Sequence, residues 1–266
     1  MLITPQDILS LLSGGVVGFV LGLVGGGGSI IAVPLLLYAV GIQDPHVAIG
    51  TSAIAVSLSA LSNLVNHARN GTVRWPCAVS FSLAGIAGAF AGSSLALHLP
   101  GQDLLPLFGL LMIVVGAAML LRKDAESNPD IRLNFSTARQ LLPLLLLIGF
   151  SVGALSGFFG IGGGFLIVPG LMLATGMPIA NAIATSLAAV TAFGATTAAN
   201  YSLAGLVDWR VAIFFIGGGI LGGAAGALAG RHLGQVKGRL SVVFAAFVII
   251  IGLYVLYKGA APFFTG

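Results

Sequence analysis

Two glycine-rich runs are the parts of this chain best suited to bind a ligand. They read Gly-Leu-Val-Gly-Gly-Gly-Gly-Ser at residues 22–29 and Gly-Phe-Phe-Gly-Ile-Gly-Gly-Gly at residues 157–164, each inside a long apolar stretch. Glycine is a poor helix former, costing about 1 kcal/mol relative to alanine. A helix that begins inside a membrane has unpaired N–H groups and a partial positive charge at its first turn. The runs therefore predict broken membrane helices that bind a small anion through backbone N–H groups.

The candidate binding positions in the two runs are Gly25, Gly26, Gly27, Gly28, Ser29, Gly160, Gly162, Gly163 and Gly164. Close packing of membrane helices is the alternative explanation for such glycines. Packing requires a small residue only about every fourth position, whereas four glycines follow one another in the first run. Helix breakage and close ligand approach therefore explain the runs better than packing does.

Hydroxyl pairs open the next apolar segment after each run. These pairs are Thr51-Ser52 and Thr185-Ser186. Their hydroxyls could donate hydrogen bonds to an anion near the broken helices. The alternative is capping, or a hydrogen bond to a carbonyl of the same helix, which serine and threonine often make.

Amides close the same two segments at Asn66 and Asn200. An amide exposed to lipid is costly, so these side chains are expected to face protein or a water-filled pathway. Hydrogen bonding between helices is the alternative to a role in binding. His67 could couple protons to transport. The equivalent position in the second half is Tyr201, so such a role would be asymmetric.

Several classes of chemistry lack the residues they need. The aspartates and glutamate lie in loops or at segment ends, which argues against a carboxylate-driven cation pump. There is no His-Glu-x-x-His or Gly-x-Ser-x-Gly motif, and one cysteine, Cys77, excludes an internal disulfide and a multi-cysteine metal site. We therefore expect no enzymatic activity, no catalytic residue, no metal and no cofactor.

The composition indicates a polytopic membrane protein. Hydrophobic residues make up 58% of the 266 residues and charged residues 7%, whereas a soluble domain carries roughly 25% charged residues. The net charge of +4 does not indicate nucleic acid binding, because lysine and arginine lie between apolar segments rather than in a basic patch. The expected partners are the lipid bilayer and a small anion, and the sequence leaves the oligomeric state open.

The chain contains an internal repeat. Gly22, Gly25, Gly27, Gly28, Pro34 and Gly41 recur 135 residues later, and Ser52, Asn66, Gly71, Val73, Trp75, Gly85, Gly88 and Gly92 recur 134 residues later. This duplication predicts a first membrane repeat at 1–121, a cytoplasmic linker at 122–139 and a second membrane repeat at 140–266.

Each repeat contains five apolar segments, and the second of each is short. The segments are about 6–24, 29–41, 47–66, 76–98, 104–121, 140–159, 164–175, 181–203, 210–230 and 239–258. A bilayer crossing needs about 20 apolar residues. Five crossings per repeat would invert the second copy, and four would not. The distribution of lysine and arginine fits either scheme. The predicted fold is all-α with 8–10 crossings, and we favour an inverted repeat because broken helices commonly occur in such repeats.

These motifs resemble those of the sulfite exporter TauE/SafE family of membrane permeases. The likeness lies in the glycine-rich run that leads to an apolar stretch and Pro34 or Pro169, the Thr-Ser opening, and the Asn…Gly-x-Val-x-Trp close. It covers essentially the whole chain. The resemblance implies a secondary transporter of the bacterial cytoplasmic membrane that exports sulfite, organosulfonates or related small anions. A passive anion channel and a membrane scaffold or assembly factor remain alternatives at this point.

Overall fold

The computed structural model describes residues 4–121, 135–160, 164–232 and 237–264, and this part of the chain is helical with no strand. The first half contains α1 (Pro5–Val24), the 3₁₀ helix η1 (Gly25–Ile31), α2 (Ala32–Pro34), the π-helix η2 (Leu35–Ala39), α3 (Pro45–Arg69), α4 (Trp75–Leu97) and α5 (Gly101–Leu121). The second contains α6 (Phe135–Phe159), α7 (Gly164–Thr175), α8 (Ile179–Leu203), α9 (Trp209–His232) and α10 (Lys237–Phe264). The predicted all-α class is confirmed, and α6 begins earlier than the expected end of the linker.

Seven of the described helices are long and apolar enough to cross a membrane. Three further apolar helices, 28–39, 164–175 and 245–259, are shorter. Large apolar side chains such as Leu83, Leu147 and Ile213 are exposed on the outer surface of the bundle, where a bilayer would cover them. The chain is therefore a multi-pass membrane protein.

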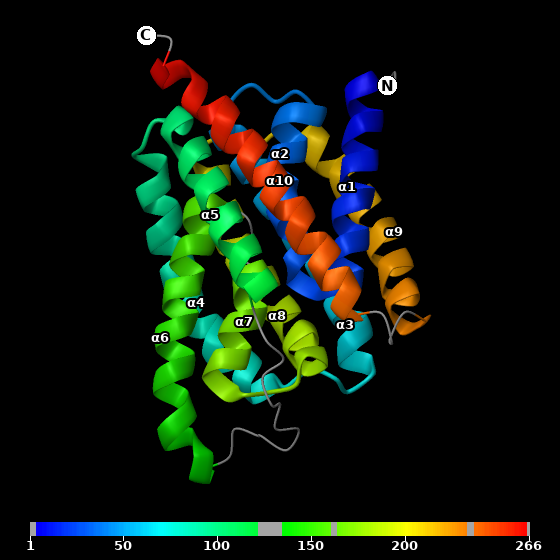
Figure 1. The fold of residues 1–266 in the computed structure, drawn as a ribbon, viewed down its shortest axis with the longest axis vertical. Coiled ribbons are helices and arrows are strands. Elements are labelled where there is room, and N and C mark those ends of the chain that lie inside the picture. The colour runs from blue at the N-terminus through cyan, green and yellow to red at the C-terminus, as the bar shows by residue number, and fades with distance from the viewer. Residues whose placement is uncertain (1–3, 122–134, 161–163, 233–236, 265–266) are drawn as a thin grey trace.

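The first glycine run reverses the direction of the chain. The α-helix ends at Val24 and the 3₁₀ helix η1 follows it. A Cβ atom added at Gly28 would lie 2.5 Å from the backbone nitrogen of Leu21, so η1 folds back against α1. In Figure 1 the chain then returns through α2 toward the end of the molecule at which α1 begins. The run therefore forms the tip of a helical hairpin, which we call the first hairpin (residues 5–39).

The helices on either side of the second glycine run form another hairpin. Helix α6 ends at Phe159, Gly160 adopts a left-handed φ of +66°, and α7 starts at Gly164. Helix α6 begins at the end of the molecule opposite to the start of α1, and α7 returns toward that end (Figure 1). We call residues 135–175 the second hairpin. The opposite entry of the two hairpins is consistent with an inverted repeat.

The two halves of the sequence are interleaved. The principal helix pairs are α1 with α9, α4 with α6, α5 with α10, and α3 with α8, and each pair takes one helix from each half. Glycines allow backbones to approach closely in the first three pairs, as membrane helix packing commonly requires. Gly18 of α1 faces the backbone of Gly219, and Gly153 of α6 faces the backbone of Gly85. The two sequence repeats are therefore not separate lobes.

Candidate functional site

The tips of the two hairpins meet in the interior of the molecule, where η1 packs against α7. Gly25, Gly26, Gly27, Gly28 and Ser29 lie in η1, and Ser29 is fully buried. Gly160 and Gly164 flank the break in the second hairpin. The predicted positions Gly162 and Gly163 lie outside the described residues. The structure thus places η1, which contains the first run, against α7, which begins at the end of the second run.

Ser52 is the predicted hydroxyl that lies at the break of the second hairpin. Its Oγ lies 3.1 Å from the carbonyl oxygen of Gly160 and 2.8 Å from that of Ile49. The side chain of Ile49 occupies the space that a Cβ of Gly160 would need. Glycine is therefore required at position 160 both by the left-handed backbone and by the contact with α3.

Ser186 repeats the local geometry of Ser52 in the second half. Its Oγ donates to the carbonyl of Ile183 at 2.8 Å, just as Ser52 contacts the carbonyl of Ile49 three residues earlier. Both serines are fully buried. The oxygen of each hydroxyl keeps acceptor capacity after its proton is donated to a helix carbonyl.

The two threonines of the predicted set hold helix ends across the halves. The Thr51 hydroxyl accepts a hydrogen bond from the backbone N–H of Asp208 at 3.0 Å, and the Thr185 hydroxyl accepts one from that of Arg74 at 3.1 Å. Asp208 and Arg74 directly precede α9 and α4. Each threonine therefore fastens the start of a helix that belongs to the other half.

Asn66, Asn200 and His67 lie toward the C-terminal ends of α3 and α8, far along these helices from Ser52 and Ser186. Each is 14 or 15 residues along its helix from Ser52 or Ser186, which corresponds to about 21 Å at 1.5 Å per residue. Asn66 is exposed. The Asn200 amide donates to the hydroxyls of Ser93 and Ser94 at 2.8 and 3.0 Å, which ties α8 to α4.

His67 lies at the end of α3, where its Nδ1 is 3.3 Å from the hydroxyl of Thr72. The Thr72 carbonyl in turn accepts a hydrogen bond from the Asn181 amide at 2.9 Å. This network connects the α3–α4 loop to the start of α8. The role of His67 in proton coupling stays a prediction.

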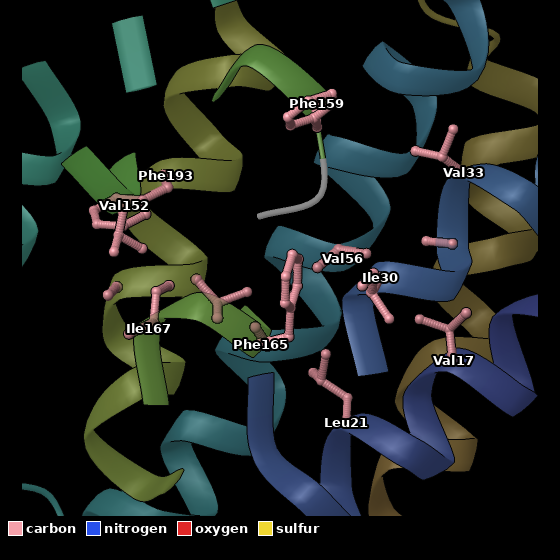
Figure 2. Packing of buried hydrophobic residues seen from close by; sticks show 14 of the residues in the cluster. Val17, Leu21, Ile30, Val33, Val56, Val152, Phe159, Phe165, Ile167 and Phe193 are labelled. Carbon is pink, nitrogen blue, oxygen red and sulfur yellow. The ribbon is translucent and has the colours of Figure 1, made fainter. Parts of the chain in front are cut away.

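Apolar side chains surround the meeting point of the hairpins. Figure 2 shows Phe165 beside Val56, with Ile30 close to them and Phe159 at the end of α6. Ile30 and Val56 are fully buried, and Phe165 and Phe159 nearly so. Within the described ranges, the one buried charged side chain is Asp7. It lies in the first turn of α1 and pairs with Arg210 of α9 at 2.8 Å. Any positive potential at the described hairpin tips must therefore come from the backbone.

The sequence allowed a capping role for Thr51 and Thr185 but did not show that each capped helix belongs to the other half, although a signal for this existed. Thr51 and Thr185 are equivalent in the repeat, and so are Arg74 and Asp208. A polar position that recurs just before an interfacial tryptophan, together with a recurring threonine, could have suggested a pair of symmetric caps. The Asp7–Arg210 ion pair had no such signal, because neither residue has a charged equivalent in the other half.

Comparison with known proteins gives a consistent family assignment. The family model described as sulfite exporter TauE/SafE matches residues 10–255. A "probable membrane transporter protein" of Xylella fastidiosa is 49% identical over 254 residues, which is 96% of each chain. The probable membrane transporter protein YunE of Bacillus subtilis is 28% identical over 269 residues, covering 95% of this chain and 98% of the relative. No solved structure gives a significant match.

Proposed function

Because the chain belongs to the sulfite exporter TauE/SafE family, we propose that it is a secondary transporter of small sulfur-containing anions such as sulfite or organosulfonates. The proposed location is the bacterial cytoplasmic membrane, and export is the proposed direction. The similarity to probable membrane transporter proteins of two bacteria supports both a membrane location and a transport function.

The observation that carries the proposal is the meeting of two broken helices from opposite ends of the molecule. Transporters commonly bind their substrate where interrupted helices meet near the membrane midplane. Helix α7 begins at this point, and its first turn offers unpaired N–H groups with a partial positive charge. An anion can use both without a buried arginine or lysine. A site of this kind binds a compact oxyanion and still allows its release.

The buried hydroxyls beside the tips complete the proposed site. Ser52 and Ser186 are fully buried and lie near the start of α3 and α8. Rotation of either hydroxyl away from its helix carbonyl would allow it to donate to an oxyanion instead. The surrounding Ile30, Val56 and Phe165 exclude water, which strengthens hydrogen bonds to a bound charge.

Reconstitution into liposomes tests the proposal. Liposomes that contain the purified protein are loaded with unlabelled sulfite, sulfate, thiosulfate, sulfoacetate or taurine. Uptake of the same anion, labelled and added outside, is then measured. Counterflow, in which internal anion accelerates uptake of external anion, is the expected result. Counterflow also separates a carrier from a passive channel, which shows none. Absence of counterflow and of passive flux for the whole panel would contradict the proposed substrate class.

A glycine variant tests whether anion flux depends on the tip of the first hairpin. Gly28→Leu places a bulky side chain against the backbone of Val17 and Leu21. We expect it to abolish flux while the protein still inserts into the membrane. Gly41→Ala is the control: nothing lies within 4 Å of a Cβ at that position, so its φ of +84° adds only backbone strain of about 1–2 kcal/mol. A membrane scaffold without transport activity would tolerate a change at the hairpin tip as well as it tolerates the control.

A further inference from the structure

We infer that the units which move during transport are two bodies, each built from helices of both sequence halves. The first body consists of the first hairpin, α3 and α9. The second body consists of the second hairpin, α8 and α4. This inference rests on the proposed function, because it concerns how a carrier of this shape alternates access. The alternative is that one sequence half rocks against the other.

Backbone contacts hold α1 rigidly to α9 inside the first body. Added Cβ atoms at Gly14, Gly18 and Gly22 would strike the backbone of Phe215, Gly219 and Gly223. The contacts recur every four residues, which is one turn of the helix. Helices in such close contact cannot slide or separate without losing packing along their whole length.

The same contacts recur in the second body at the equivalent positions. Gly149, Gly153 and Gly157 of α6 face the backbone of Phe81, Gly85 and Ala89 of α4. These glycines follow Gly14, Gly18 and Gly22 by 135 residues, and their partners precede those of the first body by 134. The duplication has therefore preserved the contact itself, and not only the glycine pattern.

Polar contacts also lie within the bodies. The Thr51–Asp208 hydrogen bond joins α3 to the start of α9, and the Thr185–Arg74 bond joins α8 to the start of α4. Arg210 of α9 contacts both carboxylate oxygens of Asp7 in α1, at 2.9 and 2.8 Å. Each of these bonds would break if the sequence halves moved apart.

The interface between the bodies is formed by the crossing of α3 and α8 and by the hairpin tips, where the Ser52 hydroxyl contacts the Gly160 carbonyl of the second hairpin. At the crossing, the side chain of Ser57 and the carbonyl oxygen of Ala53 lie against Gly194, and the Ser57 hydroxyl donates to the Thr191 carbonyl at 2.8 Å. Ser57 and Thr191 are equivalent in the repeat. The pseudo-twofold axis therefore passes through this crossing, where one body can rotate against the other.

Cross-linking on α3 tests the assignment, because different positions along this helix face different bodies. A Cβ at Gly219 would lie 3.2 Å from the Cβ of Ser59, inside the first body. A Cβ at Gly50 would lie 2.8 Å from the Cβ of Tyr201, between the bodies. Both are shorter than the Cβ separation of about 3.5–4.5 Å in a disulfide, so each cross-link requires the two backbones to move apart by about 1 Å or less. The pairs S59C/G219C and G50C/Y201C are made in a Cys77→Ser background, which removes the one native cysteine.

The two pairs have opposite expected outcomes in the liposome assay. Oxidation of S59C/G219C should change the initial rate of counterflow by less than about twofold, although this bond joins the two sequence halves. Oxidation of G50C/Y201C should lower the rate at least about tenfold, because the disulfide prevents one body from rotating against the other. A reductant should restore the rate. Loss of transport on oxidation of S59C/G219C would overturn the assignment. If reduced G50C/Y201C is inactive, S57C/G194C replaces it, with a Cβ separation of 2.9 Å.

Spin-label distances give a second test that does not depend on transport. Leu12 of α1, Leu83 of α4 and Ile213 of α9 are exposed. Labels at Leu12 and Ile213 lie in different sequence halves but in the same body, and should keep one distance in lipid nanodiscs with and without the anion panel. Labels at Leu12 and Leu83 lie in the same half but in different bodies, and should give a broad or double distribution. The reverse pattern would show that the sequence halves move, and would overturn the inference even if counterflow is observed.

If no anion shows counterflow, the proposed function fails, while the labels still report which helices move together.

Discussion

The hydroxyl of Thr51 accepts a hydrogen bond from the backbone N–H of Asp208, 157 residues further along the chain. Its repeat equivalent, Thr185, accepts the same bond from Arg74. Both threonines are fully buried, and both partners lie immediately before a helix that starts with tryptophan. The two bonds show that each half of the chain supplies the anchor for a helix of the other half.

Replacement of Thr51 or Thr185 by valine should destabilise the protein by about 1 kcal/mol each, because a helix-start N–H group loses its acceptor at almost unchanged side-chain volume. The measurement is the midpoint of thermal unfolding in detergent. Thr196→Val is the control, since its hydroxyl bonds only to the Ala192 carbonyl of its own helix. An unchanged midpoint together with a raised KM for the anion would assign the threonines to substrate binding instead.

Gly18→Ala should destabilise the α1–α9 pair by about 1–3 kcal/mol, the usual cost of overpacking. The added methyl group would overlap the backbone of Gly219. Gly15→Ala provides a control on the same helix, because the nearest atom to its added Cβ is 3.9 Å away. That variant should be neutral or slightly stabilised, since alanine favours helix. Equal effects of the two substitutions on thermal unfolding would contradict the described packing.

Gly160→Ala should abolish anion flux while leaving membrane insertion intact. The substitution combines a left-handed backbone with an overlap between the new methyl group and the side chain of Ile49. Gly205→Ala separates the two causes, because Gly205 has a φ of +73° but nothing within 4 Å of its Cβ position. That control should lose about 1 kcal/mol from backbone strain alone and keep its flux. Normal flux in Gly160→Ala would show that the break in the second hairpin has no part in transport.

Asn200→Ala should lower the midpoint of thermal unfolding, because the amide bonds to Ser93 and Ser94 tie α8 to α4. About 1 kcal/mol is expected for the loss of these interactions. The equivalent residue Asn66 is exposed, so Asn66→Ala should have little effect on stability. A large loss of flux in both variants without a change in stability would favour the pathway role that the sequence also allowed.

Much of the fold could be predicted from the sequence, because in a membrane protein the apolar segments and the helices largely coincide. The segment expected at 76–98 is α4, Trp75–Leu97, and the short segment expected at 164–175 is α7 with the same bounds. The glycine runs marked the hairpin tips because no other residue combines tight reversal with close backbone approach. The family likewise followed from recurring motifs.

The pairing of helices could not be predicted in the same way. A glycine every fourth residue in α1 shows that another backbone lies against it, but the glycines of α9 and α4 offer similar surfaces. The first run was expected to leave a helix start with open N–H groups, and it instead continues as the 3₁₀ helix η1. A run of glycines has no side chains to select between these conformations, so tertiary contacts with Leu21 and α7 decide.

The exchange of helices also constrains how the protein is made. Helix α1 leaves the ribosome before α9, which covers its glycine face and begins only at Trp209. At about 5–20 residues per second, synthesis of the intervening chain takes about 10–40 seconds. During this interval the glycine face of α1 borders lipid or an insertion factor. A nascent chain that stops before Trp209 therefore lacks the helix that packs on the glycine face of α1.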